Sequence, residues 1–348
     1  MENFAIIKIF VLTALAFITA ILSTPILTHF LYKYKFGKKI REGGDTPIMS
    51  ALHAHKSGTP SSGGILVWGI VLIFSVIFWL LATYIKVDWL SQFNFLSRSQ
   101  TLLPLGAMIA AALVGLFDDI FNVKGWGKNG NGIKFKHKII IFFVIALVGA
   151  YWFYYKLDWD VIHVPFGGNY EIGWWYIPVF IAVIVGTAFA VNQTDGLDGL
   201  AGGTMLSAYA VVGAISFSQG RYDLATFCGV IVGALMAFLW FNIPPARFFM
   251  GDTGSMSLGI TLGIVAMLTN TALLLPVIGI IFVLEAFSTI IQILSKKFFK
   301  RKVFLSAPIH HHFEAIGWSE AKIVMRAWVI ACVAGVLGLV IALLDKIV

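Results

Sequence analysis

Long apolar runs separated by short polar segments make up most of the chain. Each run is close to the roughly 20 residues that a helix needs to cross the hydrocarbon core of a bilayer, so the pattern predicts ten spans. The predicted spans are 4–32, 61–85, 100–117, 137–155, 174–191, 200–217, 224–241, 255–269, 272–295 and 323–345. We therefore expect an all-α polytopic membrane protein in which residues 1–348 form a single integral membrane domain.

The composition supports this fold class. Hydrophobic residues make up 59% of the chain and charged residues 12%, against about 45–50% and about 25% in soluble globular proteins. With a mean hydropathy of +0.89, the chain cannot cover a soluble surface, which excludes an ordinary soluble enzyme, a disordered chain and a fibrous repeat. Cys228 and Cys332 both lie in apolar runs, so neither a disulfide framework nor a cysteine zinc site is expected.

The net charge of +8 is concentrated in alternate loops. Lys and Arg are frequent in 33–56, 118–138 and 296–326 and sparse in the loops between them. The positive-inside rule places these basic loops in the cytoplasm, and ten spans then put both termini outside. A basic chain can also bind nucleic acid, but charge beside apolar spans indicates topology, and no nucleic-acid partner is expected.

Five aspartates fall at the same predicted membrane face. Asp118 and Asp119 follow the third span, Asp195 and Asp198 connect the fifth to the sixth, and Asp252 precedes the eighth. Carboxylates near hydrocarbon are costly and would repel one another, and a divalent cation such as Mg²⁺ would offset both effects. Two simpler explanations remain open: adjacent aspartates can mark the water boundary of a helix, and the second pair can serve as helix caps.

A second unusual segment is Pro308-Ile309-His310-His311-His312-Phe313-Glu314. Three consecutive side chains cannot all face one way on a helix or a strand, so one or two histidines are expected to project into a site. Zinc ligation is an alternative. Because no cysteine is near and several carboxylates are, we favour contact with a phosphate beside an oxygen-ligated metal.

The second span opens with Lys56-Ser57-Gly58-Thr59-Pro60-Ser61-Ser62-Gly63-Gly64. Thr59 and Pro60 are typical of a helix start, and the paired glycines allow close approach of another backbone. A helix N-terminus also favours an anion. On this segment alone, a plain helix cap is the simpler interpretation.

These motifs together resemble those of bacterial phospho-N-acetylmuramoyl-pentapeptide transferases. The resemblance rests on residues 192–201, 251–255 and 308–314, and the Asp118-Asp119 pair and Thr59-Pro60-x-x-Gly63-Gly64 match the same family. It extends over nearly the whole chain. The triple histidine followed by Phe-Glu is the most specific element, because it distinguishes this family from relatives that transfer N-acetylglucosamine phosphate.

The resemblance implies a reaction in the bacterial plasma membrane. UDP-N-acetylmuramoyl-pentapeptide and undecaprenyl phosphate would yield lipid I and UMP, with Mg²⁺ as cofactor, as the first membrane step of peptidoglycan synthesis. A site at the cytoplasmic face of the bilayer reaches both the soluble nucleotide and the lipid. Such phosphoryl transfer depends mainly on positioning and charge neutralisation. The family likeness would also accommodate a homodimer, which the sequence itself does not show.

The resemblance also implies roles for individual residues. Asp252 would be the principal Mg²⁺ ligand, Asp118 a second ligand and the base for the lipid phosphate, and Asp119 a supporting group. His310 and His311 would contact the diphosphate. The substrate contacts would come from Lys56, Thr59, Asn192, Asp195, Asp198, Asn242, Phe249, Gly251 and His312. Phe249 would stack on uracil, although a place in the apolar core explains it equally well.

Several alternatives stay open. A covalent aspartyl intermediate competes with direct attack. Transfer of another UDP-N-acetylhexosamine phosphate is the nearest alternative activity, and an ion-coupled transporter is disfavoured because transporter sites usually lie near the midplane between repeated halves. Where family members usually carry a lysine four residues after the first aspartate, this chain has Asn122, and the next lysine is Lys124. The segment 127–132 predicts a flexible, turn-rich loop.

Overall fold

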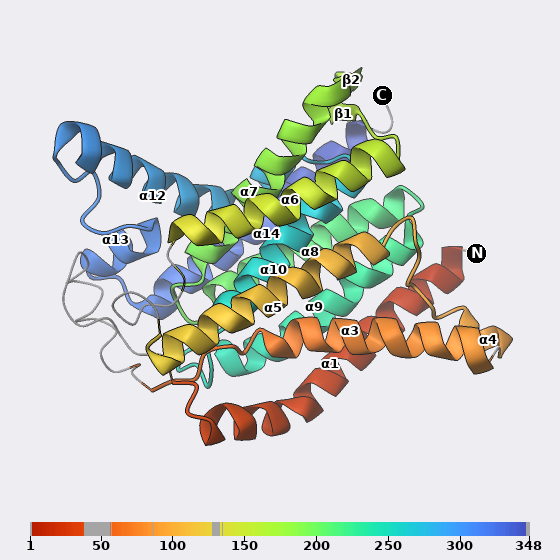
Figure 1. Ribbon diagram of the computed structural model, residues 1–348, viewed down its shortest axis with the longest axis horizontal. Helices are drawn as coiled ribbons and strands as arrows, with labels where there is room; N and C mark the ends of the chain where they lie inside the picture. The colour runs from red at the N-terminus through yellow and green to blue at the C-terminus, as the bar shows by residue number, and fades with distance from the viewer. Residues whose placement is uncertain are drawn as a thin grey trace.

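The computed structural model describes residues 2–37, 56, 58–85, 87–126, 133 and 135–345. Helices dominate it (Figure 1). The α-helices are α1 (Glu2–Lys33), α3 (Ile65–Leu80), α4 (Asp88–Ser91), α5 (Leu102–Lys124), α6 (Phe135–Lys156), α7 (Tyr176–Thr194), α8 (Leu200–Ser218), α9 (Tyr222–Asn242), α10 (Gly251–Leu268), α11 (Leu275–Ile278), α12 (Ile280–Phe299), α13 (Ile309–Ala315) and α14 (Glu320–Asp345). A π-helical turn, η2 (Leu81–Ile85), extends α3, and a short 3₁₀ turn, η4 (Gly173–Trp175), precedes α7. The predicted loop at 127–132 lies outside the described residues.

Within the described part of the chain, nine helices are long and apolar enough to cross a membrane: α1, α3 with η2, α5 to α10, and α14. The prediction of a polytopic, mainly helical membrane protein is thereby confirmed. The remaining predicted span, 272–295, is divided by Gly279 into α11 and α12. Polar side chains recur along one buried face of α12, at Glu285, Ser288, Gln292 and Ser295. This spacing marks an amphipathic helix rather than a uniformly apolar one.

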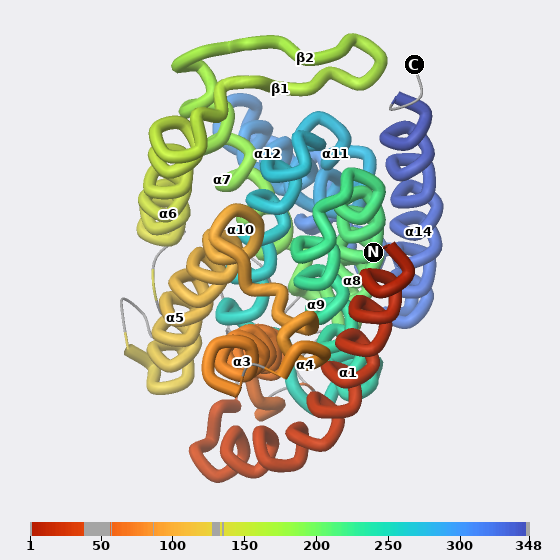
Figure 2. The backbone as a smooth tube through the Cα atoms, turned by 90° about the vertical axis from the view of Figure 1, so that its right-hand side faces the viewer, coloured from red at the N-terminus to blue at the C-terminus, as the bar shows by residue number. Residues whose placement is uncertain are grey.

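Helix α10 forms the centre of the bundle, with α5, α7 and α8 packed around it (Figure 2). Small residues permit the close approach. A Cβ added at Gly115 of α5 would lie 2.4 Å from the backbone oxygen of Asp252, and one at Gly259 of α10 would lie 2.9 Å from the Cα of Ala188 in α7. Close backbone packing through small residues is how membrane helices associate without a hydrophobic driving force. It brings the start of α10 against the last turns of α5.

Helix α5 continues beyond its predicted end at 117 to Lys124, where Gly125 caps it with φ = 69°. Asp118 and Asp119 therefore lie within the helix rather than in the loop that follows it. Both side chains are buried, with 1% and 4% of their surface exposed. Buried carboxylates need polar partners. Other elements of the fold provide partners for Asp118 and Asp119, so the helix can continue past both aspartates.

Both described ends of the chain lie at one end of the bundle, and α13 and the last turns of α5 lie at the other (Figure 1). A short antiparallel hairpin of β1 (Val161–Val164) and β2 (Gly168–Glu171), absent from the predicted pattern, covers the terminal end. His163 of this hairpin pairs with Asp345 at the end of α14, and Asp345 also accepts a hydrogen bond from the N–H of Phe166 at 2.5 Å. The hairpin, which follows α6 in the chain, is therefore joined to the end of α14.

Candidate active site

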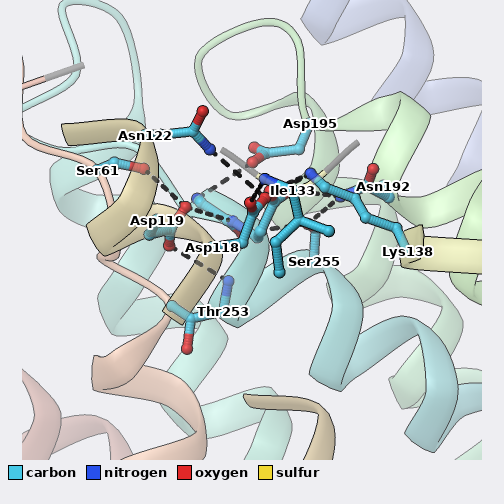
Figure 3. A network of polar contacts seen from close by, with 12 residues as sticks. Ser61, Asp118, Asp119, Asn122, Ile133, Lys138, Asn192, Asp195, Thr253 and Ser255 are labelled. Carbon is cyan, nitrogen blue, oxygen red and sulfur yellow. Dashed lines mark hydrogen bonds and ion pairs between the residues drawn. The ribbon is translucent and has the colours of Figure 1, made fainter. Parts of the chain in front are cut away.

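Two aspartates from different helices converge on one ammonium group, and Figure 3 shows Asp118 and Lys138 of this cluster. Lys138 Nζ, in the first turn of α6, lies 2.6 Å from Asp118 Oδ2 and 2.5 Å from Asp252 Oδ2. The N–H of Ile133 donates to Asp118 Oδ1 at 2.5 Å, and Asn122 donates to Asp118 Oδ2 at 3.4 Å. We call Asp118, Asp252 and Lys138 the acidic centre, because two carboxylates there face a single cation.

Asp119 has a different role from its neighbour. Its carboxylate accepts hydrogen bonds from the backbone N–H groups of Asp252, at 3.0 Å, and Thr253, at 3.3 Å, and from the Ser62 hydroxyl at 2.9 Å. A negative group at a helix N-terminus satisfies free N–H donors and interacts favourably with the helix dipole. Asp119 therefore fixes the start of α10 against α5, and with it the position of Asp252.

Gly251 makes this close contact possible. Its φ of +74° lies in the left-handed region, and a Cβ there would sit 2.4 Å from Asp119 Oδ2. Only glycine takes this conformation without a steric penalty. Gly251, which the sequence analysis expects to contact substrate, thus shapes the acidic centre through its backbone conformation.

The end of α7 supplies two further polar groups. Asn192 Nδ2 donates to Asp252 Oδ1 at 2.7 Å and to the Ser255 hydroxyl at 2.9 Å. Asp195 Oδ2 accepts a hydrogen bond from the N–H of Gly251 at 3.1 Å. Asp252 is consequently held on one oxygen by Asn192 and on the other by Lys138. Hydrogen bonds and ion pairs join six of the residues predicted from sequence in this one network: Asp118, Asp119, Asn192, Asp195, Gly251 and Asp252. Figure 3 labels the first four of them.

Lys56 and Asp198 form a second charged group next to the first. Lys56 Nζ lies 2.7 Å from Asp198 Oδ1 and 2.5 Å from Glu320 Oε1, and Glu320 also accepts the N–H of Asp198 at 2.7 Å. The same ammonium lies 5.9 Å from the centre of the half-buried Phe249 ring. This cluster ties the α7–α8 loop to the first turn of α14, with an aromatic face beside it.

Asn242 and Thr59 stabilise the loops around these groups. Asn242 is buried, its Oδ1 accepts the N–H of Gly199 at 2.9 Å, and its Nδ2 donates to the backbone oxygen of Phe248 at 2.9 Å. The N–H of Thr59 donates a hydrogen bond to the backbone oxygen of Lys56 at 3.2 Å. Both amide atoms of Asn242 are thus engaged with backbone, and its substrate contact stays a prediction.

The three histidines lie on α13 and point in different directions, as expected. His310 and His311 are buried, and each ring places Nδ1 on a glutamate: His310 on Glu285 at 2.8 Å and His311 on Glu314 at 2.7 Å. His312 is half-buried, and its Nδ1 accepts the N–H of Leu305 at 3.3 Å. The first two histidines are therefore held by carboxylates, whereas the third supports the segment that leads into α13.

The donor chemistry of the acidic centre fits Mg²⁺. Among the described residues, no group of three or more histidine, cysteine or acidic side chains is arranged around a common metal position. Mg²⁺ does not require such a cage: it usually takes one or two carboxylates, substrate phosphate oxygens and several waters. Asp118 and Asp252 supply two convergent carboxylates that already face a cation, with Asn192 as a further amide beside them.

Sequence reasoning missed several polar partners. Lys138 entered the sequence analysis only as one charge of a basic loop, and Glu285 only as part of an apolar span. Their signals were weak: a lysine in the first turn after a loop, and one acid inside a hydrophobic run. Ser62 and Ser255 lie within motifs that the sequence analysis named, and Glu320 does not, but the partners of all three depend on which helices are neighbours.

Comparison with known proteins agrees with the motifs. The model of the family described as glycosyl transferase family 4 matches residues 101–270. A phospho-N-acetylmuramoyl-pentapeptide-transferase of Chloroflexus aggregans is 38% identical over 96% of this chain and 89% of its own length. The corresponding proteins of Geobacillus thermodenitrificans, 38% identical over 94% of this chain and 96% of their own length, and Anoxybacillus flavithermus, 37% identical over 96% and 98%, are similar to the same extent. With such identity over nearly the full length of both chains, this protein belongs to the phospho-N-acetylmuramoyl-pentapeptide transferase family.

Proposed function

We propose that this membrane transferase moves phospho-N-acetylmuramoyl-pentapeptide from its UDP-linked form to undecaprenyl phosphate. An oxygen of the lipid phosphate attacks the phosphorus that carries the sugar, the bond from that phosphorus to the bridging oxygen breaks, and UMP leaves. The products are lipid I and UMP. The observation that supports this function best is the convergence of Asp118 and Asp252 on one cation in a chain of this family.

In this proposal the acidic centre prepares the diphosphate for attack. Asp252 and Asp118 would hold Mg²⁺, which supplies charge neutralisation on the diphosphate and makes UMP a better leaving group. Asp118 would also accept the proton of the lipid phosphate, since it faces the same position. Asp119 has its oxygens engaged with the start of α10, so it acts by fixing Asp252. The proposal is direct attack, in which no carboxylate forms a covalent bond to phosphorus.

The neighbouring groups would bind the nucleotide. Phe249 offers an aromatic face for uracil, with Lys56 beside the ring. His310 and His311 would contact the diphosphate. Asp195 and Asp198, in the loop between α7 and α8, would orient the nucleotide against the centre.

We also propose the orientation of the protein in the bacterial plasma membrane. The basic loops and the acidic centre would face the cytoplasm, where the nucleotide is found, and both termini would lie outside. The location of both described ends at one end of the bundle supports an even number of crossings, with α12 completing ten (Figure 1). A homodimer is also part of this proposal, and mass measurement of the detergent-solubilised protein would test it.

Release of UMP by the purified protein tests this function. With both substrates and Mg²⁺, wild type should release UMP, whereas removal of Mg²⁺ or the change Asp252→Ala should reduce release by at least about 100-fold. Asp88→Ala, at an exposed position in α4 at the opposite end, is the matched control and should behave as wild type. Equal release by Asp252→Ala and wild type would remove Asp252 from the mechanism.

A second nucleotide distinguishes the alternative activity. UDP-N-acetylglucosamine in place of the muramoyl substrate should give no UMP. Release from this nucleotide alone would establish the other transferase specificity. Release from neither would contradict the transferase proposal altogether.

A further inference from the structure

One buried nitrogen in the described structure has no hydrogen-bond partner although its ring is firmly held. His310 is 1% exposed, and its Nε2 makes no hydrogen bond. An unsatisfied polar atom in a protein interior costs about 1–3 kcal/mol. Proteins therefore keep few such atoms, and each one calls for an explanation, often a functional one.

Glu285 determines the direction of this ring. Its Oε2 lies 2.8 Å from His310 Nδ1 and 3.4 Å from the His310 backbone N–H, and the Glu285 side chain is buried. An ionised carboxylate only accepts hydrogen bonds. Nδ1 therefore carries the hydrogen, and Nε2 is left as the free atom of the ring.

The polar face of α12 holds α13 in place as well. Gln292 accepts the N–H groups of Val303 and Phe304, both at 3.0 Å, and donates to the Phe304 oxygen at 2.9 Å. Ser295 donates to the backbone oxygen of Arg301 at 2.9 Å. The segment leading into α13 is thus fixed to α12, the same helix that carries Glu285. Contacts with α12 therefore determine both the position and the rotation of the His310 ring.

The free nitrogen points at the loop between α7 and α8. A Cβ added at Gly196 would lie 2.2 Å from His310 Nε2. Gly196 follows Asp195, which binds the start of α10 through Gly251. The ring edge therefore borders the loop that links the histidine segment to the acidic centre, and the absence of a side chain at Gly196 leaves room for it.

We propose that Glu285 is a positioning residue for the transfer reaction, which fixes His310 so that Nε2 meets the diphosphate of the nucleotide. This inference rests on the proposed function. To donate to a phosphate oxygen, His310 must be protonated on both nitrogens, and the Glu285 carboxylate balances that charge. A carboxylate that orients an imidazole in this way is a recurring arrangement in enzymes. Glu285 itself touches no substrate.

Kinetics of single and double variants test the proposal. Glu285→Gln keeps the size of the side chain but removes its charge, and it should lower kcat for UMP release about 10- to 100-fold, the usual loss for such a supporting group. If Glu285 acts only through His310, the double variant Glu285→Gln/His310→Ala should match His310→Ala within about twofold. Glu171→Gln, exposed on the terminal hairpin, is the control and should keep wild-type kcat.

Three outcomes would overturn the proposal: wild-type kcat in Glu285→Gln, losses that multiply in the double variant, or a change in KM for undecaprenyl phosphate with kcat intact. If Glu285→Gln does not fold, Gly196→Ala replaces it, because it displaces the ring from the opposite side and should likewise add nothing to His310→Ala. Absence of UMP release by wild type would instead show failure of the proposed function itself.

Discussion

Lys138 offers the sharpest test of the acidic centre. Its ammonium lies 2.6 Å from one aspartate of the centre and 2.5 Å from the other, and Lys138→Met removes the charge while keeping most of the apolar stem. The two carboxylates then face each other without a counter-charge. Like charges this close in a poorly solvated place are strongly unfavourable.

The size of the effect follows from the burial of the three groups. Removing one partner of a buried ion pair costs about 3–5 kcal/mol. The Asp118 side chain keeps 1% of its surface exposed, but Lys138 and Asp252 keep 16% and 17%, so the lower end applies, about 3 kcal/mol. At about 2 °C for each kcal/mol in a chain of this size, the apparent Tm should fall by about 6 °C.

Thermal unfolding of the detergent-purified protein measures this change, with and without Mg²⁺. Mg²⁺ should raise the apparent Tm of Lys138→Met more than that of wild type, because the carboxylates no longer hold an ammonium. Lys136→Met, at an exposed site on the same helix, is the matched control and should match wild type. An unchanged Tm in Lys138→Met would refute the buried ion pair, and an absent Mg²⁺ response would refute the cation site.

Three further outcomes are expected. Gly115→Ala places a methyl group 2.4 Å from a backbone oxygen of α10 and should cost about 1–3 kcal/mol and most UMP release, whereas Gly106→Ala, which meets open space, should do neither. Burial alone would lower the pKa of His163, but its hydrogen bonds to Asp345 and a neighbouring asparagine raise this pKa above its usual 6.5. The ion pair between His163 and Asp345 is therefore fully formed below pH 6.5, and it is lost as the pH rises through the raised pKa of His163. The protection of the hairpin amides against hydrogen exchange, taken relative to their intrinsic rate at each pH, should be greater at pH 6 than at pH 8, and a difference in protection that persists in His163→Ala would contradict this origin. Lys8→Met removes a buried ammonium 3.0 Å from a carboxylate of α9; the apparent Tm should fall while UMP turnover by the folded protein persists, and lost turnover would show that the two ends are coupled.

The sequence predicted most helices because hydrophobic length alone specifies a membrane span. The starts and ends of α8 and α9 agree with the predicted spans to within about two residues. The hairpin at Val161–Glu171 was missed because its strands are short and carry no clear alternation. Helix α12 was predicted as a uniform span since its polar positions, such as Glu285, are too sparse to break the hydrophobic average.

The site was predictable to the extent that its residues are unusual in a membrane chain. Asp252 and Asp118 stood out because acids are rare beside hydrocarbon, and the fold brings them to one ammonium. Lys138 did not stand out, since lysines are ordinary in basic loops. Asn242 shows the opposite case. It is a polar residue near the site, but its side-chain amide hydrogen-bonds to the backbone of two loops, and only the folded structure shows these partners.

The adjacent aspartates at the end of α5 are chemically identical, but loss of activity in a variant of one does not have the same explanation as loss of activity in a variant of the other. Asp119 accepts hydrogen bonds from two backbone N–H groups at the start of α10, so changing it shifts the peptide that carries Asp252. An inactive Asp119 variant would therefore say nothing about proton transfer. Its neighbour Asp118, which meets Lys138 through Oδ2 and the N–H of Ile133 through Oδ1, is the aspartate whose change tests the chemistry more directly.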